Sequence, residues 1–458
     1  NPLSGVTIQI KGKKSFATTT DNQGLFKLDA PENTVLVFSS VGYQNTEIKI
    51  GKETYYSITL QRTDSKLDEV VVVGFGTQKK KDLTGSVATI SSKDLENRPN
   101  TQFGYSIEGK APGVEVIRSS GQPQAGFSIR IRGTSSITSG SDPIYIVDGV
   151  QTYNTNEINP ADIESITVLK DASSAAIYGS SGANGVVLIT TKRGLNQKTK
   201  INFSTSLGVS SVWKKMKMLN STEFHSLMDD LGQTTNWSLY NANTNWQNEV
   251  FRNALSQNYQ LSASGGNKKT GYYISGSAIN QNGVVINNNV SRISFKFNGD
   301  HQLNKFLKIG TSLTYDNWRD RDVPENDRNG VITRLYTCVP IIGIRNPSNP
   351  LEYARSPFIN DVENPVSTVY QPDHQYKNNR LHGNIYAEGK IMKNLSVKSL
   401  LGFENGTGEF NSFQDSVQTR YGQTMGGICA KNKYKYKFWM SENTASFNKK
   451  INDHTISL

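Results

Sequence analysis

The side chains best suited to catalysis or metal binding in this chain do not form a catalytic set. None of its histidines belongs to an HExxH or HxxE arrangement, so the paired ligands of a helical zinc site are missing. The five histidines are His225, His301, His374, His382 and His454. The sequence therefore gives no support for a metal centre.

Two glycine-containing motifs come close to cofactor-binding or catalytic signatures. Gly74-Phe75-Gly76 lacks the third glycine of a dinucleotide-binding loop, because Lys79 occupies that position. Gly179-Ser180-Ser181-Gly182 misses the G-x-S-x-G spacing of a hydrolase elbow by one residue. We therefore expect no cofactor and no catalytic residues, so the sequence predicts a protein that is not an enzyme.

The cysteines and tryptophans fit structural roles. Cys338 and Cys429 are too few for a disulfide framework, and unpaired thiols are favoured, although a bond between two loops stays open. Four tryptophans fall near expected strand ends or in loops, where membrane-interface anchors are favoured over sugar-stacking platforms. They are Trp213, Trp237, Trp246 and Trp318.

A run of four valines, Val70 to Val73, follows Asp68-Glu69 and precedes Gly74. The run does not alternate as a half-buried strand must, and it is far too short for a membrane helix. It must bury both faces or await a partner, and its polar borders make it easy to pair by its backbone edge. The alternative is that it is the last strand of the first domain.

The composition predicts several domains dominated by β-structure. The charge sum is 50 minus 39, or +11, but basic residues cluster tightly only at Lys79-Lys80-Lys81, which argues against a nucleic-acid groove. Hydrophobic residues make up 35% of the 458 residues, and abundant Gly, Asn, Ser, Thr and Tyr fit strands and turns better than helical bundles.

The expected elements divide the chain into four parts. Residues 1–62 show the short alternating strands of a small β-sandwich, 63–82 form a hinge, 83–197 have a mixed α/β pattern, and 198–458 contain long alternating strands. In the mixed domain, Asp148-Gly149 is expected to be a hairpin turn. Arg130 and Arg132 alternate with Ile129 and Ile131, so a strand would present both guanidinium groups to one surface.

The fourth part has the two-residue repeat of a membrane-facing sheet. Leu307, Ile309 and Leu313 alternate with hydrophilic or small residues, and Tyr434, Tyr436 and Phe438 alternate with three lysines. One apolar and one hydrophilic face is the pattern of a barrel with lipid outside and water inside, although a large soluble sheet would alternate in the same way. The lysines are Lys433, Lys435 and Lys437.

Several motifs in register identify a family resemblance. Residues 128–133 (SIRIRG), 143–150 (PIYIVDGV) and 162–171 (DIESITVLKD) closely resemble the plug of SusC/RagA-type TonB-dependent outer-membrane transporters, and 175–179 and 183–192 extend the match. The family carries an Asp-Glu-Val-Val-Val-Val-Gly run at its TonB box, matched here by Asp68 to Gly74. Residues 20–26 and 38–43 resemble the carboxypeptidase regulatory-like, transthyretin-like domain, minus its first strand.

The resemblance implies a fold and a function. The fold would be mainly β, with a small sandwich, a mixed α/β plug and an incomplete antiparallel transmembrane barrel. About nine strands are predicted where plugged transporters need about 22, so the native protein is expected to extend past Leu458. The chain starts without an initiator Met or a signal peptide, so further sequence before Asn1 is expected as well. The function would be proton-motive-force-driven import of a nutrient across the bacterial outer membrane, with the N-terminal domain and TonB box in the periplasm.

Partners and sites follow from the same resemblance. TonB, with its inner-membrane energising complex, would contact Asp68, Glu69, Val70, Val71, Val72 and Val73, and a SusD-like surface lipoprotein would sit on the extracellular loops. Oligosaccharides are the first expectation for the ligand and peptides the second; a ligand-sensing receptor or an adhesin is the alternative from another class. Arg130 and Arg132 are expected either to form a salt bridge inside the plug or to latch the plug to the barrel wall, since a buried ion pair is costly to half-break.

Overall fold

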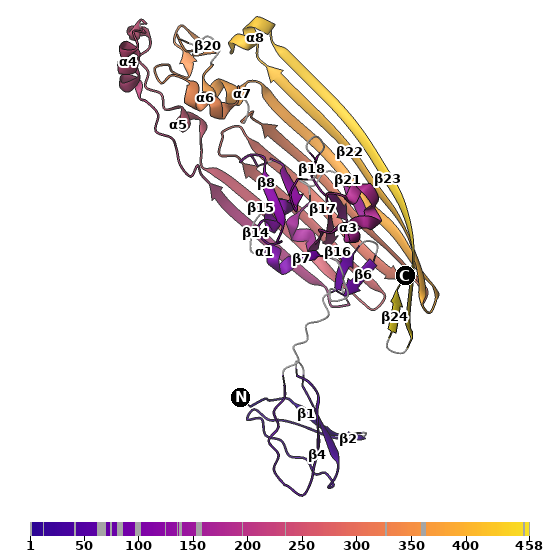
Figure 1. Cartoon of the computed structure of the whole chain (residues 1–458). Coiled ribbons are helices and arrows are strands. Elements are labelled where there is room, and N and C mark those ends of the chain that lie inside the picture. The colour runs from indigo at the N-terminus through magenta and orange to yellow at the C-terminus, as the bar shows by residue number, and fades with distance from the viewer. Residues whose placement is uncertain are drawn as a thin grey trace. The chain divides into compact units, whose positions relative to one another are not determined.

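The computed structural model describes two compact units, residues 1–71 with 78–83 and residues 72–77 with 84–458 (Figure 1). Within them, the described residues are 2–11, 13–40, 43–61, 70–73, 76–79, 86–96, 102–123, 125–134, 136, 140–152, 158–194, 196–233, 235–325, 328–358, 363–451 and 454–457.

The first unit is a small antiparallel β-domain. Strands β1 (Thr7–Ile10), β2 (Lys13–Thr19), β3 (Val35–Ser39) and β4 (Thr46–Lys49) form one sheet in the order β2-β1-β3-β4. The alternation of apolar residues along β1 and β3 buries Ile8, Leu36 and Phe38. Segments containing Phe26, Leu28, Ile58 and Leu60 pack against these residues as the second layer of the core.

The valine run is a strand. Residues Val70–Val73 form β5, which pairs with β6 (Gly76–Lys79) in a two-stranded sheet. Asp68 and Glu69 lie outside the described residues. The run is therefore extended, as predicted, and one backbone edge of it is already occupied.

The plug contains a five-stranded mixed sheet in the order β11-β10-β13-β12-β7. Its strands are β7 (Val87–Ser91), β10 (Ile144–Val147), β11 (Val150–Thr152), β12 (Ile163–Leu169) and β13 (Val186–Thr191). A hairpin of β8 (Val114–Arg118) and β9 (Phe127–Ile131) lies beside it, with short helices α1 (Ser92–Glu96), α2 (Phe103–Ile107) and α3 (Ala172–Ala175) and the 3-10 turns η2 (Pro160–Asp162) and η3 (Ala176–Gly182).

A continuous apolar core holds the plug together. Phe103 and Ile107 from α2 pack with Ile129 from β9, Ile166 from β12 and Ile189 from β13, all of them buried. The rings of Phe103 and Phe127 meet edge to face at 5.2 Å. The plug can therefore remain one body when its surroundings change.

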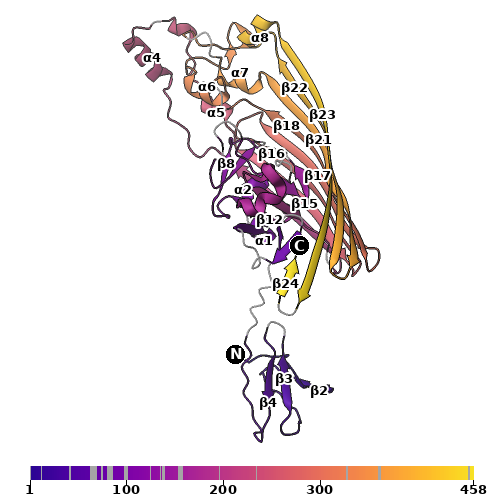
Figure 2. The same cartoon turned by 45° about the vertical axis from the view of Figure 1, so that its right-hand side comes forward.

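The fourth part of the chain is an open antiparallel sheet, called the wall below. Its strands run in sequence order from β14 to β24. They are β14 (Lys200–Ser210), β15 (Ala254–Gly266), β16 (Thr270–Asn282), β17 (Asn289–Gln302), β18 (Leu307–Asp322), β21 (Asp373–Met392), β22 (Leu395–Gln414), β23 (Ile428–Ile451) and β24 (His454–Ser457). Figures 1 and 2 show the wall curving around the plug, which lies on its concave face. This is the predicted incomplete barrel.

The two faces of the wall differ as the two-residue repeat requires. On β17, Ile293, Phe295 and Phe297 are exposed on the convex face, whereas Ser294 and Lys296 are buried on the plug side. On β23 the interpretation that the aromatic residues face lipid is wrong. Tyr434, Tyr436, Phe438 and Met440 face the concave side, and Lys431, Lys433, Lys435, Lys437 and Trp439 face outward.

Glycines on the neighbouring strand explain this orientation of β23. A Cβ atom on Gly406 would lie 2.2 Å from the ring of Tyr436, and one on Gly408 would lie 2.1 Å from the ring of Tyr434. The two tyrosine rings fill space that only glycine leaves open. Tyr434 also donates a hydrogen bond of 2.9 Å from its hydroxyl to Asn378 Oδ1 on the concave face.

Two long connections at one end of the wall build a cap with its own core. They contain α4 (Ser221–Asp230), η4 (Trp237–Leu239), α5 (Trp246–Val250), α6 (Val331–Thr337), β19 (Arg345–Asn346), β20 (Asn349–Tyr353) and α7 (Pro365–Tyr370), and α8 (Arg420–Met425) lies nearby. Trp246 is buried there and donates its indole N–H to Val339 O at 2.9 Å, so the anchor interpretation is wrong for this residue.

Cys338 is buried and Cys429 exposed, and both are free thiols. Every helix in the described residues is too short or too polar to cross a membrane.

Candidate functional site between plug and wall

The first contact between plug and wall is made by the turn that joins β10 to β11. Asp148 and Gly149 have φ values of 49° and 88°, which fits the tight hairpin turn that an Asp-Gly pair favours. This turn points the Asp148 carboxylate at the wall. Its backbone carbonyl accepts a hydrogen bond of 2.7 Å from Asn384 Nδ2 on β21.

The Asp148 carboxylate is the centre of a buried polar cluster. Its Oδ1 accepts from the Thr191 backbone N–H at 2.9 Å, and its Oδ2 accepts from Ser312 Oγ on β18 at 2.7 Å. Lys296 Nζ on β17 lies 3.5 Å from Oδ2, and both charged side chains are only 3% exposed. Burial alone would raise the pKa of Asp148, but Lys296, Arg193 and the Thr191 hydrogen bonds together hold that pKa at about 2. The pair is therefore ionic and shared by plug and wall.

A second carboxylate joins the plug to β15 and β16. Asp162, in the short turn that Asn159 caps, is buried. Its Oδ1 accepts hydrogen bonds from Gln260 Nε2 at 2.8 Å, Tyr273 OH at 2.7 Å and Ser275 Oγ at 2.7 Å. Three wall donors on one oxygen fix the position of this turn against the sheet.

The end of β13 makes a third polar contact. Asn298 Nδ2 on β17 donates to Thr191 Oγ1 at 2.8 Å and to Lys192 O at 2.6 Å. Arg193 Nη1 lies 2.9 Å from Asp300 Oδ1, which also accepts from the Tyr386 hydroxyl. The exit of the chain from the plug into the wall is therefore held by an amide and an ion pair.

A fourth contact joins β11 to β21 and β22. Arg380 Nη2 and Glu404 Oε2 are 2.9 Å apart, with side chains 3% and 8% exposed. Thr152 of the plug lies between them, donating from Oγ1 to Glu404 Oε2 at 3.3 Å and accepting from Arg380. Beside this contact, Val150 packs against Tyr386 and Leu400.

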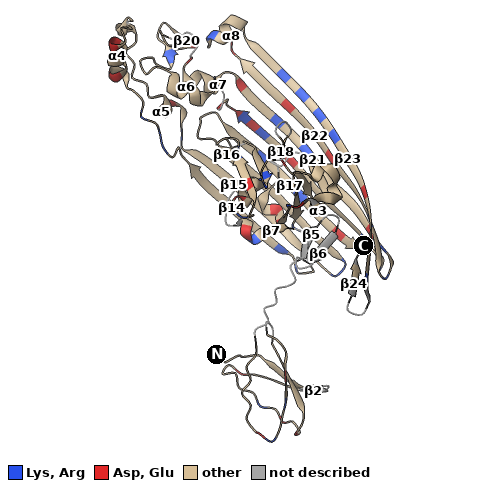
Figure 3. Ribbon diagram, viewed as in Figure 1, with Lys and Arg blue, Asp and Glu red and all other residues tan. Residues whose placement is uncertain are grey.

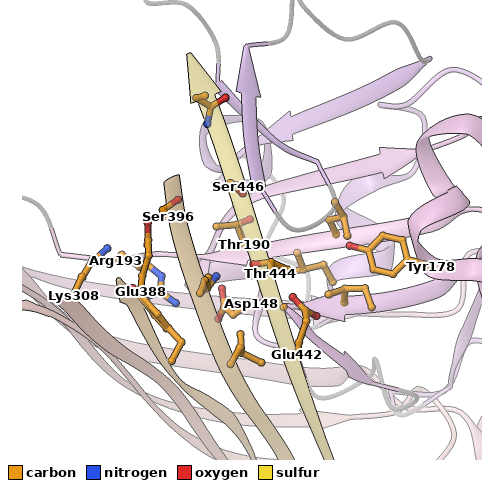
Figure 4. Close-up of a pocket in the computed structure, with 18 residues that line it drawn as sticks. Asp148, Tyr178, Thr190, Arg193, Lys308, Glu388, Ser396, Glu442, Thr444 and Ser446 are labelled. Carbon is orange, nitrogen blue, oxygen red and sulfur yellow. The ribbon is translucent and has the colours of Figure 1, made fainter. Parts of the chain in front are cut away.

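The plug is therefore held against the wall by four polar contacts, made by Asp148, Asp162, Thr191 with Arg193, and Thr152. These contacts are called the polar seat below. A cavity of about 460 Å³ adjoins this seat and is lined by plug and wall residues. Figure 4 shows Arg193, Lys308 and Glu388 on one side of the cavity and Tyr178 on the other. A polar cavity of this size has room for water molecules.

Comparison with known proteins agrees with this architecture. Residues 79–186 match the TonB-dependent Receptor Plug Domain, and residues 1–72 match the CarboxypepD_reg-like domain. The chain is 33% identical over 464 residues to TonB-dependent receptor P3 of Formosa agariphila, covering 100% of this chain and 46% of that protein. It is 31% identical over 439 residues to TonB-dependent receptor SusC of Bacteroides thetaiotaomicron, covering 89% of this chain and 43% of that protein.

A solved structure of the RagAB peptide importer in the "open-open" state matches with a TM-score of 0.74 and 25% identity, covering 85% of this chain and 48% of that chain. The chain belongs to the SusC/RagA-type TonB-dependent transporters. It spans about half the length of the relatives it matches.

The arginines predicted from the transporter motif do not lie together on one strand face. Strand β9 ends at Ile131, and Arg132 follows with a φ of 59°, so the alternation stops before it. Arg132 forms an ion pair with Asp171, also in the plug, and the Arg132 side chain is 52% exposed. Two roles were possible for Arg132, a salt bridge inside the plug or a contact with the wall. The structure shows the salt bridge inside the plug. Asp171 is the N-cap residue of α3 and makes no side-chain capping hydrogen bond.

A latch function of Arg130 and Arg132 stays a prediction. Replacing both with Gln tests it, because the Arg132–Asp171 pair lies at the protein surface and its loss alone should change stability little. A latch predicts altered uptake and a more open pore in conductance recordings. Unchanged uptake and conductance would reject the latch.

The residues that seat the plug were only partly visible in the sequence. Asp148 lies inside one of the transporter-like motifs, where the Asp-Gly pair predicts only a turn, and Asp162 begins another of these motifs. Their partners, including Lys296 and Gln260, lie 148 and 98 residues further along the chain. Lys296 could have indicated the contact with the plug, because it is a charged residue on the hydrophilic face of a strand whose other face is apolar.

Proposed function

We propose that this chain is the plug-bearing part of an importer that takes a nutrient oligosaccharide across the bacterial outer membrane, driven by the proton-motive force through TonB. The choice of oligosaccharide rests on the family resemblance. A SusD-like surface lipoprotein acting on the cap end of the wall is part of the proposal, as is a periplasmic position for the N-terminal domain. The role is transport without catalysis.

The observation that carries the proposal is the polar seat of the plug. Asp148, Asp162, Thr152 and Arg193 bind the wall through hydrogen bonds and ion pairs, while the apolar core lies inside the plug. Polar groups that separate in the presence of water regain hydrogen bonds, whereas a parted apolar interface would not. The plug is therefore built to move or be remodelled as a unit, as an import path requires.

The proposed TonB contact is Asp68, Glu69 and Val70 to Val73. Since β5 pairs with β6 on one edge, TonB would add a strand at the other edge or displace β6. Force along this strand would then reach the plug through residues 74–86. The proposed division of the chain is a regulatory-like domain over 1–62, a hinge over 63–82, a plug over 83–197 and barrel strands over 198–458.

Peptide import is the second candidate. It is favoured by the likeness of the fold to the RagAB peptide importer. The contacts between plug and wall do not distinguish an oligosaccharide from a peptide, because they hold the plug in place and do not contact the ligand.

Uptake by cells with and without the gene tests the proposal. Cells are given a fluorescent maltooligosaccharide or xylooligosaccharide panel and, separately, a labelled peptide mixture. We expect uptake of one oligosaccharide class that requires the protein and stops when a protonophore collapses the proton-motive force. Protein-dependent uptake of peptides would establish the second candidate, and binding without protein-dependent uptake of either would contradict an import function.

A further inference from the structure

The convex face of the wall carries a cluster of basic side chains near the cap end. Antiparallel register places Arg319 on β18 opposite Lys377 on β21, and Lys377 opposite Glu409 on β22. Glu409 in turn lies opposite Lys433 on β23. Lys431, Lys435 and Lys437 follow the same face of β23, and Figure 3 shows the blue segments repeating along it. We call these six cations the outer basic belt: Arg319, Lys377, Lys431, Lys433, Lys435 and Lys437.

The belt has few anions to neutralise it. Glu409 pairs with Lys431 and with Lys433, each at 3.2 Å. Within the described residues no ion pair is formed by Arg319, Lys377, Lys435 or Lys437. All six cations are exposed.

The spacing of the belt makes its charges repel. Residues two apart on a strand lie about 7 Å apart on one face, which is within the Debye length of about 8 Å at physiological salt. Arg319 and Lys377 are directly opposite each other, an arrangement of like charges that destabilises a sheet. Anions bound from outside the protein would remove this repulsion.

An exposed apolar band lies on the side of the belt away from the cap. On β23 the next outward residue after Lys437 is Trp439, whereas on β18 and β21 Asn317 and Asn379 come between the belt and the band residues Tyr315 and Leu381. Ile385 and Leu401 continue the band. Trp439 is 74% exposed and follows Lys437 on the outward side of β23, the kind of position that interface tryptophans occupy. Apolar side chains and cations are therefore stacked in the order that a membrane presents acyl chains and headgroups.

We propose that the outer basic belt binds lipids with anionic phosphate or carboxylate headgroups in the outer leaflet, whose acyl chains lie on the apolar band below. This inference rests on the outer-membrane location proposed above but not on transport. An acidic protein partner would use the cations without the adjoining apolar band, so the lipid fits the observed surface better. The belt side chains point away from the convex face of the sheet. A further strand paired with the backbone edge of β23 would therefore not cover them.

Lipid binding by the detergent-purified native protein tests this proposal. The belt variant carries Arg319→Gln, Lys377→Gln, Lys435→Gln and Lys437→Gln, which removes the four cations without an ion pair. The control carries Lys268→Gln, Lys269→Gln, Lys305→Gln and Lys393→Gln. These control lysines are exposed in the short turns at the opposite end of the wall, and they remove the same charge.

Lipid A in micelles is titrated against each protein, with phosphatidylcholine and inorganic phosphate as comparison ligands. Each membrane-facing cation contributes about fivefold to the affinity for anionic lipid. We therefore expect the dissociation constant for lipid A to rise at least about tenfold in the belt variant and less than about twofold in the control. Added salt should weaken binding in the unmodified protein.

Three results would overturn the proposal. They are equal lipid A affinity in the belt and control variants, equal preference for phosphatidylcholine, and complete competition by millimolar inorganic phosphate, which would indicate a site for free anions. Thermal unfolding of each variant shows that it is folded. Because nutrient uptake is measured separately, loss of lipid binding and loss of transport are distinguishable.

Discussion

Replacing Glu69 to Val73 with a Gly-Ser segment of equal length is expected to reduce nutrient uptake to the level of cells that lack the protein. The four valines form an extended strand, β5, and valine is among the residues that favour strand pairing. A Gly-Ser segment keeps the chain length but loses the β-propensity and the side chains that a TonB strand would pack against. Ligand binding at the cell surface should change by less than about twofold, because the plug and cap residues are untouched.

The matched control replaces residues 63–67, which precede the TonB contact in the same hinge, with a Gly-Ser segment of the same length. Uptake in this control should stay within about twofold of the unmodified protein, since a flexible linker transmits tension. Labelled-ligand uptake and binding are measured on the same cells. Persistent uptake after replacement of residues 69–73 would reject the assigned TonB contact.

Replacing Lys296 with Met is expected to loosen the attachment of the plug to the wall. Met leaves the Asp148 carboxylate buried in the seat without its nearest cation. Breaking a buried ion pair in this way costs about 3–5 kcal/mol. We expect a lower unfolding temperature and larger or more frequent pore openings in planar-bilayer recordings.

A second substitution separates the charge effect from lost packing. Asp148→Asn in the Lys296→Met background removes the uncompensated charge and should restore part of the stability, a coupling that the double-mutant cycle measures. Lys305→Met, in an exposed turn, is the control and should change stability by less than about 0.5 kcal/mol. If Lys296→Met behaves like Lys305→Met, the ion pair does not seat the plug.

Local rules predicted one turn of the plug correctly. The Asp148-Gly149 pair predicted the hairpin turn that follows the strand Ile144–Val147. The same rules placed Arg130 and Arg132 on one face, and this was wrong because the positive φ of Arg132 ends the strand. The positive φ of Arg132 is uncommon for arginine and cannot be predicted from the alternation of apolar and polar residues.

The orientation of β23 needed information from a neighbouring strand. Alternating tyrosines and lysines predict two different faces, but the pattern is symmetric and does not say which face is inside. Gly406 and Gly408 on β22 decide it, because they make space for the tyrosine rings on the concave side. The polar seat was hidden for a similar reason: Asp148 and Lys296 meet only after the plug and wall are both folded.

The most direct test of the account is whether the seat opens when the hinge strand is pulled. Ser275→Cys places a thiol in the seat, where Ser275 is buried and donates to Asp162, in a protein whose exposed Cys429 has been changed to Ser. We predict rapid labelling by a maleimide in energised cells with ligand, and slow labelling after a protonophore or after replacement of residues 69–73. Labelling at the same rate in all three conditions would contradict the account.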